Sequence, residues 1–323
     1  MAWRLRLVPE KTNINFFAIQ WATFGASIFA MLASLVLIFT MGLNFGIDFR
    51  GGTTIRTEST APVDVGVYRD ALSGIDAGDV SITQVFDPSF RDDQHVAMIR
   101  LSARDGEESV TPEVIAQVEA ALTAVDPAIT FPSVESVGPK VSQELITSAL
   151  LAVLAGAIGI LAYVWVRFEW QFAVGTVAAL IHDVLVTVGI FALFQIKFDL
   201  TIVAALLTIL GYSVNDTVVI FDRLRENLAK YKQMPLREMM NLTANETLSR
   251  TIMTASTTFI SLMVLFIFGG DVIRGFVFAM LLGVVLGTYS TLYMAKNIVL
   301  MLGVDRSDKT KKPGKGEFAN VDA

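Results

Sequence analysis

The sequence predicts a polytopic α-helical membrane protein with six transmembrane helices and one soluble α+β domain after the first of them. Of the 323 residues, 53% are hydrophobic and only 17% are charged, and the mean hydropathy is +0.58. Six apolar runs approach or exceed the roughly 20 residues that a helix needs to cross a bilayer. A polar stretch of about 100 residues separates the first run from the other five.

The charge of the chain is unevenly divided. Residues 44–144 contain seven Lys and Arg against 17 Asp and Glu, a net charge of −10, whereas the remaining residues carry +4. The chain has no cysteine, which excludes disulfides and Cys-based sites, and its two histidines are too few for a His-rich metal site. We therefore expect no metal, no other cofactor and no nucleic-acid partner.

The first apolar run covers about Phe16–Met41 and follows a basic N-terminal segment. A secretory signal peptide also begins with basic residues, but its apolar region spans only about 7–15 residues and ends at a small-residue cleavage site. This run is longer, and residues 42–45 (GLNF) make a poor cleavage site. We predict that residues 1–43 form a cytoplasmic N-terminus and an uncleaved first span.

Residues 44–144 have the pattern of a small α+β domain, with elements in the order βαββαβ that is typical of a ferredoxin-like fold. Thr111 and Pro112 suit the N-cap and the first position of a helix. No P-loop, paired catalytic acids or nucleophile–base pair is present, so binding or movement is the expected use. Strands are predicted at Thr53–Thr57, Ser81–Phe86, Val96–Leu101 and Ile129–Val134, and helices at Val65–Leu72 and from Pro112, the latter with Val114, Val118, Ala121, Leu122 and Val125 inside.

The membrane body, residues 145–304, holds five further apolar runs, most of them joined by hairpins too short to contain domains. The segment 222–250 is longer and basic, and its Leu224, Leu228 and Tyr231 have the spacing of an amphipathic helix on the membrane surface. The five spans are predicted at about Leu145–Val166, Phe172–Phe194, Leu200–Phe221, Thr251–Phe268 and Phe276–Leu300.

Basic residues predict the orientation of the spans. They gather in the N-terminal segment, near Arg167, in the 222–250 segment and in the polar tail of residues 305–323, which we expect to be disordered. With six spans all four places fall on one side, the cytoplasmic side by the positive-inside rule. We predict a multi-pass inner-membrane protein with both termini in the cytoplasm and the acidic domain in the periplasm of a Gram-negative cell.

An acidic residue in the fourth apolar run is the first candidate for chemistry. Asp at the centre of a membrane helix costs about 2.5–3.5 kcal/mol, so such residues usually face the bundle interior and serve a function. Asp216 forms a polar stripe with Thr208 and Tyr212, and Ser213 and Asn215 lie beside it. The alternative is an Asp at the membrane edge that reaches water, although its side chain is too short to do so as Lys and Arg do.

The fifth run begins next to Arg250 and presents Thr254 and Thr258 on a hydroxyl face. Arg250 and Asp216 both lie toward the cytoplasmic ends of antiparallel spans, so they can meet. An arginine close to an aspartate favours the ionised acid, and its withdrawal favours protonation, as a proton relay requires. The alternatives are a positive-inside anchor for Arg250 and simple helix packing for the hydroxyls.

The third run holds His182 and Asp183 close to the middle of the membrane, and both are candidates for the same relay. Thr176 and Thr187 share a helical face with Asp183. The alternative is a buried His or Asp that bonds to a neighbouring hydroxyl and serves packing alone.

Two glycine motifs lie outside this candidate relay. Gly283 and Gly287 form a G-x-x-x-G pattern in the last span, which is typical of helix packing. The stretch 46–52 (GIDFRGG) lacks the ending of a Walker A loop, so phosphate binding is not expected. We predict a tight connection whose glycines take unusual backbone angles. Its four motif residues are Gly46, Asp48, Gly51 and Gly52.

Several stretches together resemble the SecD/SecF family of bacterial protein-export subunits. The resemblance covers nearly the whole chain, to about residue 300, and the motif in the fourth run is the most specific. The matching stretches are 46–52 (GIDFRGG), 137–141 (VGPKV), 182–183 (HD), 211–223 (GYSVNDTVVIFDR) and 249–258 (SRTIMTASTT).

The resemblance implies a SecD partner that completes a twelve-span unit similar to resistance-nodulation-division transporters, and association with the SecYEG channel and other translocase accessory subunits. It implies inward proton flow through Asp216 and Arg250, with Asp183 as a third member, that moves the outer domain and assists late translocation of an unfolded preprotein. Because this chain has six spans, the complete proton path is expected to need residues of the partner.

Two other functions stay open at this point. One is a small-molecule or lipid transporter of the resistance-nodulation-division type, although a complete pump would show an internal repeat with two outer domains. The other is a structural scaffold in which the polar residues only join helices. An enzyme is not expected, because no group of residues meets the geometric requirements of a catalytic site.

Overall fold

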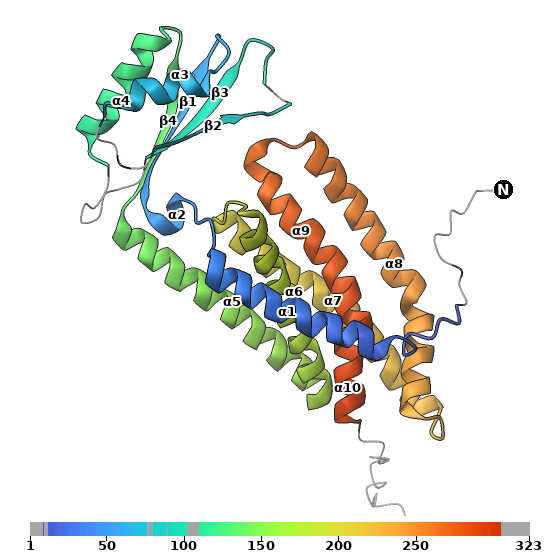
Figure 1. Ribbon diagram of the computed structural model, residues 1–323. Coiled ribbons are helices and arrows are strands. Elements are labelled where there is room, and N and C mark those ends of the chain that lie inside the picture. Colours follow the sequence, from blue (N-terminus) through green and yellow to red (C-terminus); the bar gives the residue numbers. More distant parts are fainter. Residues whose placement is uncertain are drawn as a thin grey trace, which may run out of the picture.

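The computed structural model describes residues 12–75, 80–88, 90–101 and 110–304, together with Pro9 and Gly78. These residues form a sheet domain, residues 52–137, and a bundle of long helices (Figure 1). The basic N-terminal segment and the tail of residues 305–323, for which we predict disorder, lie outside the described residues.

The sheet domain follows the predicted order βαββαβ. Its strands form one antiparallel sheet in the order β2-β3-β1-β4, so the first strand lies between the third and the fourth. Ile55 at the centre of β1 pairs with Ile99 of β3 and with Val134 of β4. The elements are β1 Gly52–Ser59, α3 Val65–Leu72, β2 Val80–Val85, β3 His95–Leu101, α4 Pro112–Val125 and β4 Thr130–Val137.

Side-chain caps start both helices of this domain. Asp64 accepts hydrogen bonds from the N–H groups of Gly66 (2.8 Å) and Val67 (3.2 Å) at the start of α3. Thr111 accepts one from the N–H of Val114 at the start of α4, with proline at the first helical position. The predicted helix start at residue 112 is therefore confirmed, and its cause is the cap.

The inner face of α4 is the predicted one except at its end. Val118 and Leu122 have no exposed surface and share an apolar cluster with Ile55 of the sheet. The prediction for Val125 is wrong, because this last residue of the helix lies beyond the cluster and is exposed. The two other predicted members, Val114 and Ala121, pack at the margin of the cluster.

Six helices of the described chain are long and apolar enough to cross a membrane, which confirms the predicted polytopic helical membrane protein. In the most apolar 18-residue stretch of α6 and of α7, half of the residues are buried. The corresponding stretches have no buried residue in α5 and 6% in α8, so α6 and α7 are inner helices. The bounds are α1 Gln20–Met41, α5 Pro139–Arg167, α6 Trp170–Phe194, α7 Leu200–Lys230, α8 Leu236–Phe268 and a last helix in three parts, α9 Asp271–Ser290, a π-helical turn Thr291–Ala295 and α10 Lys296–Leu302.

The segment 222–250 differs from the predicted loop with a separate surface helix. Its residues continue α7 and begin α8, so that only residues 231–235 lie between the two helices. Leu224 is buried, and Leu228 and Tyr231 pack against the same apolar cluster. The helical spacing is present, but these side chains face neighbouring helices instead of a lipid surface.

Candidate functional site

A buried carboxylate joins α6, α7 and α9. Asp183 of α6 has no exposed surface. Its Oδ2 accepts hydrogen bonds from the hydroxyls of Ser213 on α7 (2.7 Å) and Ser290 on α9 (2.8 Å). Its Oδ1 lies 3.0 Å from Nδ1 of His182, which is also buried. We call these four residues the Asp183 cluster, in which both carboxylate oxygens have the partners that a buried acid requires.

A second hydroxyl pair connects α7 to the last helix. The side chains of Thr217 and Thr291 are buried, and their Oγ1 atoms lie 2.8 Å apart. Thr291 begins the π-helical turn, an irregularity that often occurs at functional sites. Ser290 and Thr291 are not among the predicted site residues. The polar run at 288–291 (TYST) within an apolar span is the signal that could have found them.

Two glycines bring α9 close to α7. A Cβ atom added at Gly283 would lie 2.7 Å from Cδ1 of Ile209, and one added at Gly287 would lie 3.2 Å from the side chain of Ser213. The packing role predicted for the G-x-x-x-G pattern is therefore confirmed. The close approach at Gly287 also allows Ser213 and Ser290 to reach the same carboxylate oxygen.

Replacing Gly283 with alanine is expected to lower the free energy of unfolding by about 1–3 kcal/mol, the usual cost of overpacking a well-filled interior. The new methyl would overlap the branched and rotationally stiff side chain of Ile209. Thermal unfolding in detergent measures the effect. Gly159→Ala in α5 is the control, because no atom lies within 4 Å of a Cβ there. Equal shifts in Tm for the two variants would contradict the prediction.

Asp216 differs from Asp183 in its partners. It is 5% exposed, and its carboxylate forms no hydrogen bond or ion pair within the part of the chain that the structure describes. Arg250 of α8 is exposed and acts on Asp216 through its charge instead of through direct contact. The Tyr212 hydroxyl is buried, lies near Thr258 of α8 and has no hydrogen-bond partner among the described residues. Asp216 is thus a buried acid whose carboxylate has no hydrogen-bond or ion-pair partner among the described residues.

The other predicted polar residues of α7 and α8 lie in different surroundings. Thr208 and Asn215 are exposed, so the polar stripe of α7 does not face the bundle along its whole length. Ser213 belongs to the Asp183 cluster. The hydroxyl of half-buried Thr254 donates to carbonyl oxygens of the preceding turn, as the helix-packing alternative predicts.

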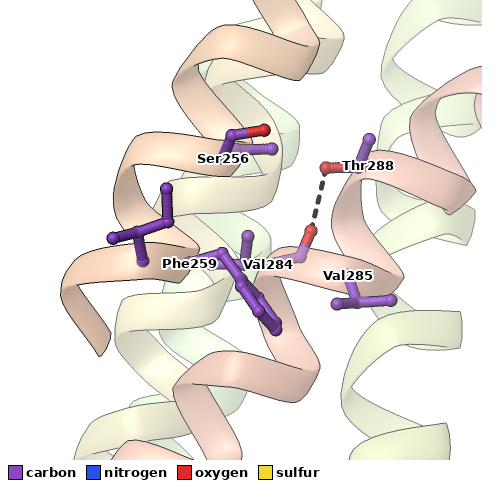
Figure 2. Close-up of a pocket in the computed structure, with 7 residues that line it drawn as sticks. Ser256, Phe259, Val284, Val285 and Thr288 are labelled. Carbon is purple, nitrogen blue, oxygen red and sulfur yellow. Dashed lines mark hydrogen bonds between the residues drawn. The ribbon is translucent and has the colours of Figure 1, made fainter. Parts of the chain in front are cut away.

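A cavity of about 400 Å³ lies between α8 and α9 (Figure 2). Its side-chain polar atoms are the hydroxyls of Ser256 and Thr288, and the Thr288 hydroxyl donates to the carbonyl of Val284 at 2.9 Å. The lining of the cavity therefore offers apolar contacts but no ionisable group. Among the described residues, no three His, Asp or Glu side chains lie together in a way that could hold a metal ion. The remaining lining residues are Ala255, Phe259, Ile260 and Val285.

Lys296 of α10 is a buried basic residue that is also missing from the predicted residues. It is 1% exposed, and its Nζ forms no hydrogen bond among the described residues. The Nζ atom lies 4.8 Å and 4.3 Å from the ring centroids of Phe16 and Phe17. Aromatic faces stabilise a desolvated cation by about 2 kcal/mol, which offsets part of the cost of burial. A lysine within the last apolar run is its signal in the sequence.

The glycine-rich stretch after α1 forms hydrogen bonds with the hairpin between α6 and α7. We call this stretch, residues 44–52, the motif clamp. The N–H of Gly46 donates to the carbonyl of Phe198, and the N–H of Phe198 donates to the carbonyl of Asn44, each at 2.8 Å. A Cβ atom at Gly46 would lie 2.9 Å from Cε of Lys197. Glycine at position 46 therefore permits this close approach.

The rest of the motif clamp fixes the start of α7 and the entry to the sheet. The carboxylate of Asp48 accepts a hydrogen bond from the N–H of Leu200 (3.1 Å), an otherwise unpaired donor of the first turn of α7. Gly51 and Gly52 have φ angles of +76° and +126°, which residues with a Cβ rarely adopt. These angles agree with the tight connection predicted from the sequence.

Two family profiles match the chain. Residues 117–305 match the family described as "Protein export membrane protein SecD/SecF, C-terminal", and residues 36–63 match "SecD/SecF GG Motif", which includes the whole motif clamp. The first match covers the Asp183 cluster, Asp216 and Arg250.

Individual relatives agree with these profiles. The chain is 71% identical to "Protein translocase subunit SecF" of Cereibacter sphaeroides, over the whole of both chains. It is 36% identical to "Protein translocase subunit SecDF" of Brucella abortus, where 93% of this chain covers 39% of the relative. The crystal structure of SecDF from Thermus thermophilus, described as a translocon-associated membrane protein, matches with a TM-score of 0.80 and 32% identity over 92% of this chain and 39% of that one. The chain therefore belongs to the SecD/SecF family of protein export membrane proteins.

Proposed function

We propose that this chain is an auxiliary subunit of the bacterial Sec preprotein translocase and that, with SecD, it uses the proton gradient to assist late translocation across the inner membrane. The full-length likeness to a protein named translocase subunit SecF supports the translocase role. The relatives named SecDF support SecD as the partner, because this chain covers only 39% of them. SecYEG, other accessory subunits and the unfolded preprotein are the further proposed partners.

The observation that carries the proton-coupled part is the environment of Asp216. A buried carboxylate without a hydrogen bond or ion pair is costly when ionised, so it gains from binding a proton. Arg250 lies on α8, whose most apolar stretch is only 6% buried, and a displacement of this helix changes how strongly the charge of Arg250 favours the ionised acid. We infer that protons pass through Asp216, with Arg250 setting its charge state.

Asp183 and His182 have a different role in this proposal. The carboxylate of Asp183 already accepts hydrogen bonds from Ser213 and Ser290 and contacts His182. Its cluster holds α6, α7 and α9 at a fixed distance and thereby positions Asp216 on α7. Asp183 remains a candidate third member of the relay, and His182 a fourth, because both are ionisable and lie in the same inner layer.

We further propose that both termini lie in the cytoplasm and that the sheet domain is a ferredoxin-like periplasmic domain. The strand order β2-β3-β1-β4 with two crossing helices supports the ferredoxin-like assignment. The basic residues near the ends of the spans support the orientation. The net charge of −10 in residues 44–144 gives this domain an acidic surface, which we expect to face an exported chain.

Removing the chain from cells is expected to lower export of a secreted precursor, and to remove mainly the part that depends on the proton gradient. Pulse-labelled precursor processing, with and without an uncoupler, measures this. The amount of SecD is followed in parallel, since loss of its partner can destabilise it. If the uncoupler slows processing equally in cells with and without the chain, proton coupling through this subunit is contradicted.

A further inference from the structure

Apart from the direct connection of β4 to α5, two attachments join the sheet domain to the bundle within the described residues, and the first is the motif clamp. Three aromatic rings surround it: Phe45, Phe49 and Phe198 lie with ring centroids 5.7–6.1 Å apart. Phe49 and Phe198 are buried. Together with the backbone hydrogen bonds between residues 44–46 and Phe198, this apolar packing makes the motif clamp a firm attachment.

A charged side chain adds to the same attachment. Arg100, at the end of β3, is partly buried beside the motif clamp, and its Nε has no hydrogen-bond partner among the described residues. Burial lowers the pKa of Arg100, and the negative charges of Asp199 and Asp48 oppose this shift. The positive charge of Arg100 on β3 and the negative charges of Asp48 and Asp199 therefore attract each other across this attachment, without an ion pair among the described residues.

The second attachment joins the loop after β2 to the turn between α8 and α9. This turn lies at the end of the bundle where the sheet domain sits (Figure 1). The N–H of Phe86 donates to the carboxylate of Asp271 at 2.7 Å, and the N–H of Asp271 donates to the carbonyl of Phe86 at 3.2 Å. A Cβ atom added at Gly270 would lie 2.7 Å from Cγ of Asp87. We call these four residues the domain clip.

The domain clip is weaker than the motif clamp. Phe86 is 65% exposed, and the Asp271 side chain is partly exposed and also pairs with Arg274. A hydrogen bond of this kind adds little net stability because water competes for both partners. Among the described residues, no buried apolar side chain packs over this contact, in contrast to the aromatic rings of the motif clamp. The domain clip is therefore the attachment that opens first.

We propose that the domain clip opens and closes during the export cycle, while the sheet domain turns about the motif clamp. This inference rests on the proposed function. The turn next to Asp271 connects α8, which carries Arg250, to α9, which supplies Ser290 to the Asp183 cluster. A displacement of α8 and α9 that accompanies proton transfer thus reaches the sheet domain through Asp271 and Phe86.

A disulfide across the domain clip tests this proposal, and the absence of native cysteines makes the chain suited to it. A Cβ at Gly270 would lie 3.3 Å from Cβ of Asp87, slightly below the usual range of about 3.5–4.5 Å for a disulfide. The double variant Asp87→Cys/Gly270→Cys is produced with SecD as the only copy in cells. Precursor export is compared in the oxidised and reduced states, and the two single variants control for oxidation itself.

We expect the oxidised double variant to export at the level of cells that lack the chain, and reduction to restore export to that of the same variant before oxidation. Equal export in the two states, with complete crosslinking and with a defect still present in cells lacking the chain, would overturn the proposal and leave the proposed function intact. If cells lacking the chain export normally, the proposed function fails, and this inference fails with it.

A second crosslink, across the motif clamp, is the matched control. A Cβ at Gly46 would lie 3.2 Å from Cβ of Asp199, nearly the same separation as in the domain clip. In the variant Gly46→Cys/Asp199→Cys, oxidation is expected to change export little relative to the reduced state, because this attachment stays closed throughout. A loss on oxidation as large as that at the domain clip would overturn the assignment of the two attachments.

Discussion

Cells whose only copy of the chain carries Asp216→Asn are expected to accumulate unprocessed precursor to nearly the level of cells without the chain. The amide has the shape of the carboxylate and can still form hydrogen bonds, but it cannot bind and release a proton. Because Asp216 forms no hydrogen bond or ion pair among the described residues, the replacement leaves no described partner unpaired. The loss therefore reports on the proton, and precursor processing in pulse-labelled cells measures it.

Two controls accompany this variant. The amount of the protein and its association with SecD must be normal, which shows that the fold and the complex are intact. Asn215→Ala, next in sequence but exposed, is expected to export normally. Normal export by Asp216→Asn would keep the translocase role, give Asp216 a structural role, and direct attention to Asp183 or to the partner subunit.

Asp183→Ala is expected to lower stability more than any other single change in the bundle. It leaves the hydroxyls of Ser213 and Ser290 and the Nδ1 of His182 without their shared acceptor. Hydrogen bonds inside membrane proteins average about 0.6 kcal/mol, and an unsatisfied buried group costs about 1–3 kcal/mol, so we expect a loss of about 2–5 kcal/mol. Thermal unfolding of the detergent-solubilised protein measures the difference.

Matched variants separate this loss from a simple change of volume. Asp183→Asn keeps one acceptor oxygen and is expected to lose less stability than the alanine variant. Ser290→Ala removes one donor and leaves the bond from Ser213 in place, so its loss should be the smallest of the three. A Tm of Asp183→Ala equal to that of the unaltered protein would show that the cluster does not hold the helices together.

The spans and the sheet domain could be predicted because their signals are local. Apolar runs, the Thr111 cap and alternating strands depend on neighbouring residues, and each appears in the structure. The structure of the 222–250 segment could not be predicted, because apolar residues with helical spacing suit a lipid surface and a neighbouring helix equally well. Only the tertiary structure shows that Leu224 packs inside the bundle.

The candidate site could be predicted only in part, because its acids are local signals in the sequence but their partners are not. Asp183 and Asp216 stand out as acids in apolar runs, and both are buried. The partners of Asp183 are 30 and 107 residues away in the sequence, so no spacing rule connects them. The predicted meeting of Asp216 with Arg250 is not a direct contact in the structure, and its place in a relay stays a prediction. The oxygens of Asp183 all have hydrogen-bond partners, whereas those of Asp216 have none among the described residues, and this difference appears only in the assembled bundle.

The π-helical turn in the last span gives one continuous helix two registers. A turn of this type holds one residue more than an α-helix of the same length, and each residue of an α-helix advances by about 100°. The extra residue therefore rotates α10 by about that angle relative to α9. Ser290 can then point to Asp183 in the inner layer while Lys296 points to Phe16 and Phe17 at the other end. The span behaves as two helices fused by a single insertion, each facing its own neighbours.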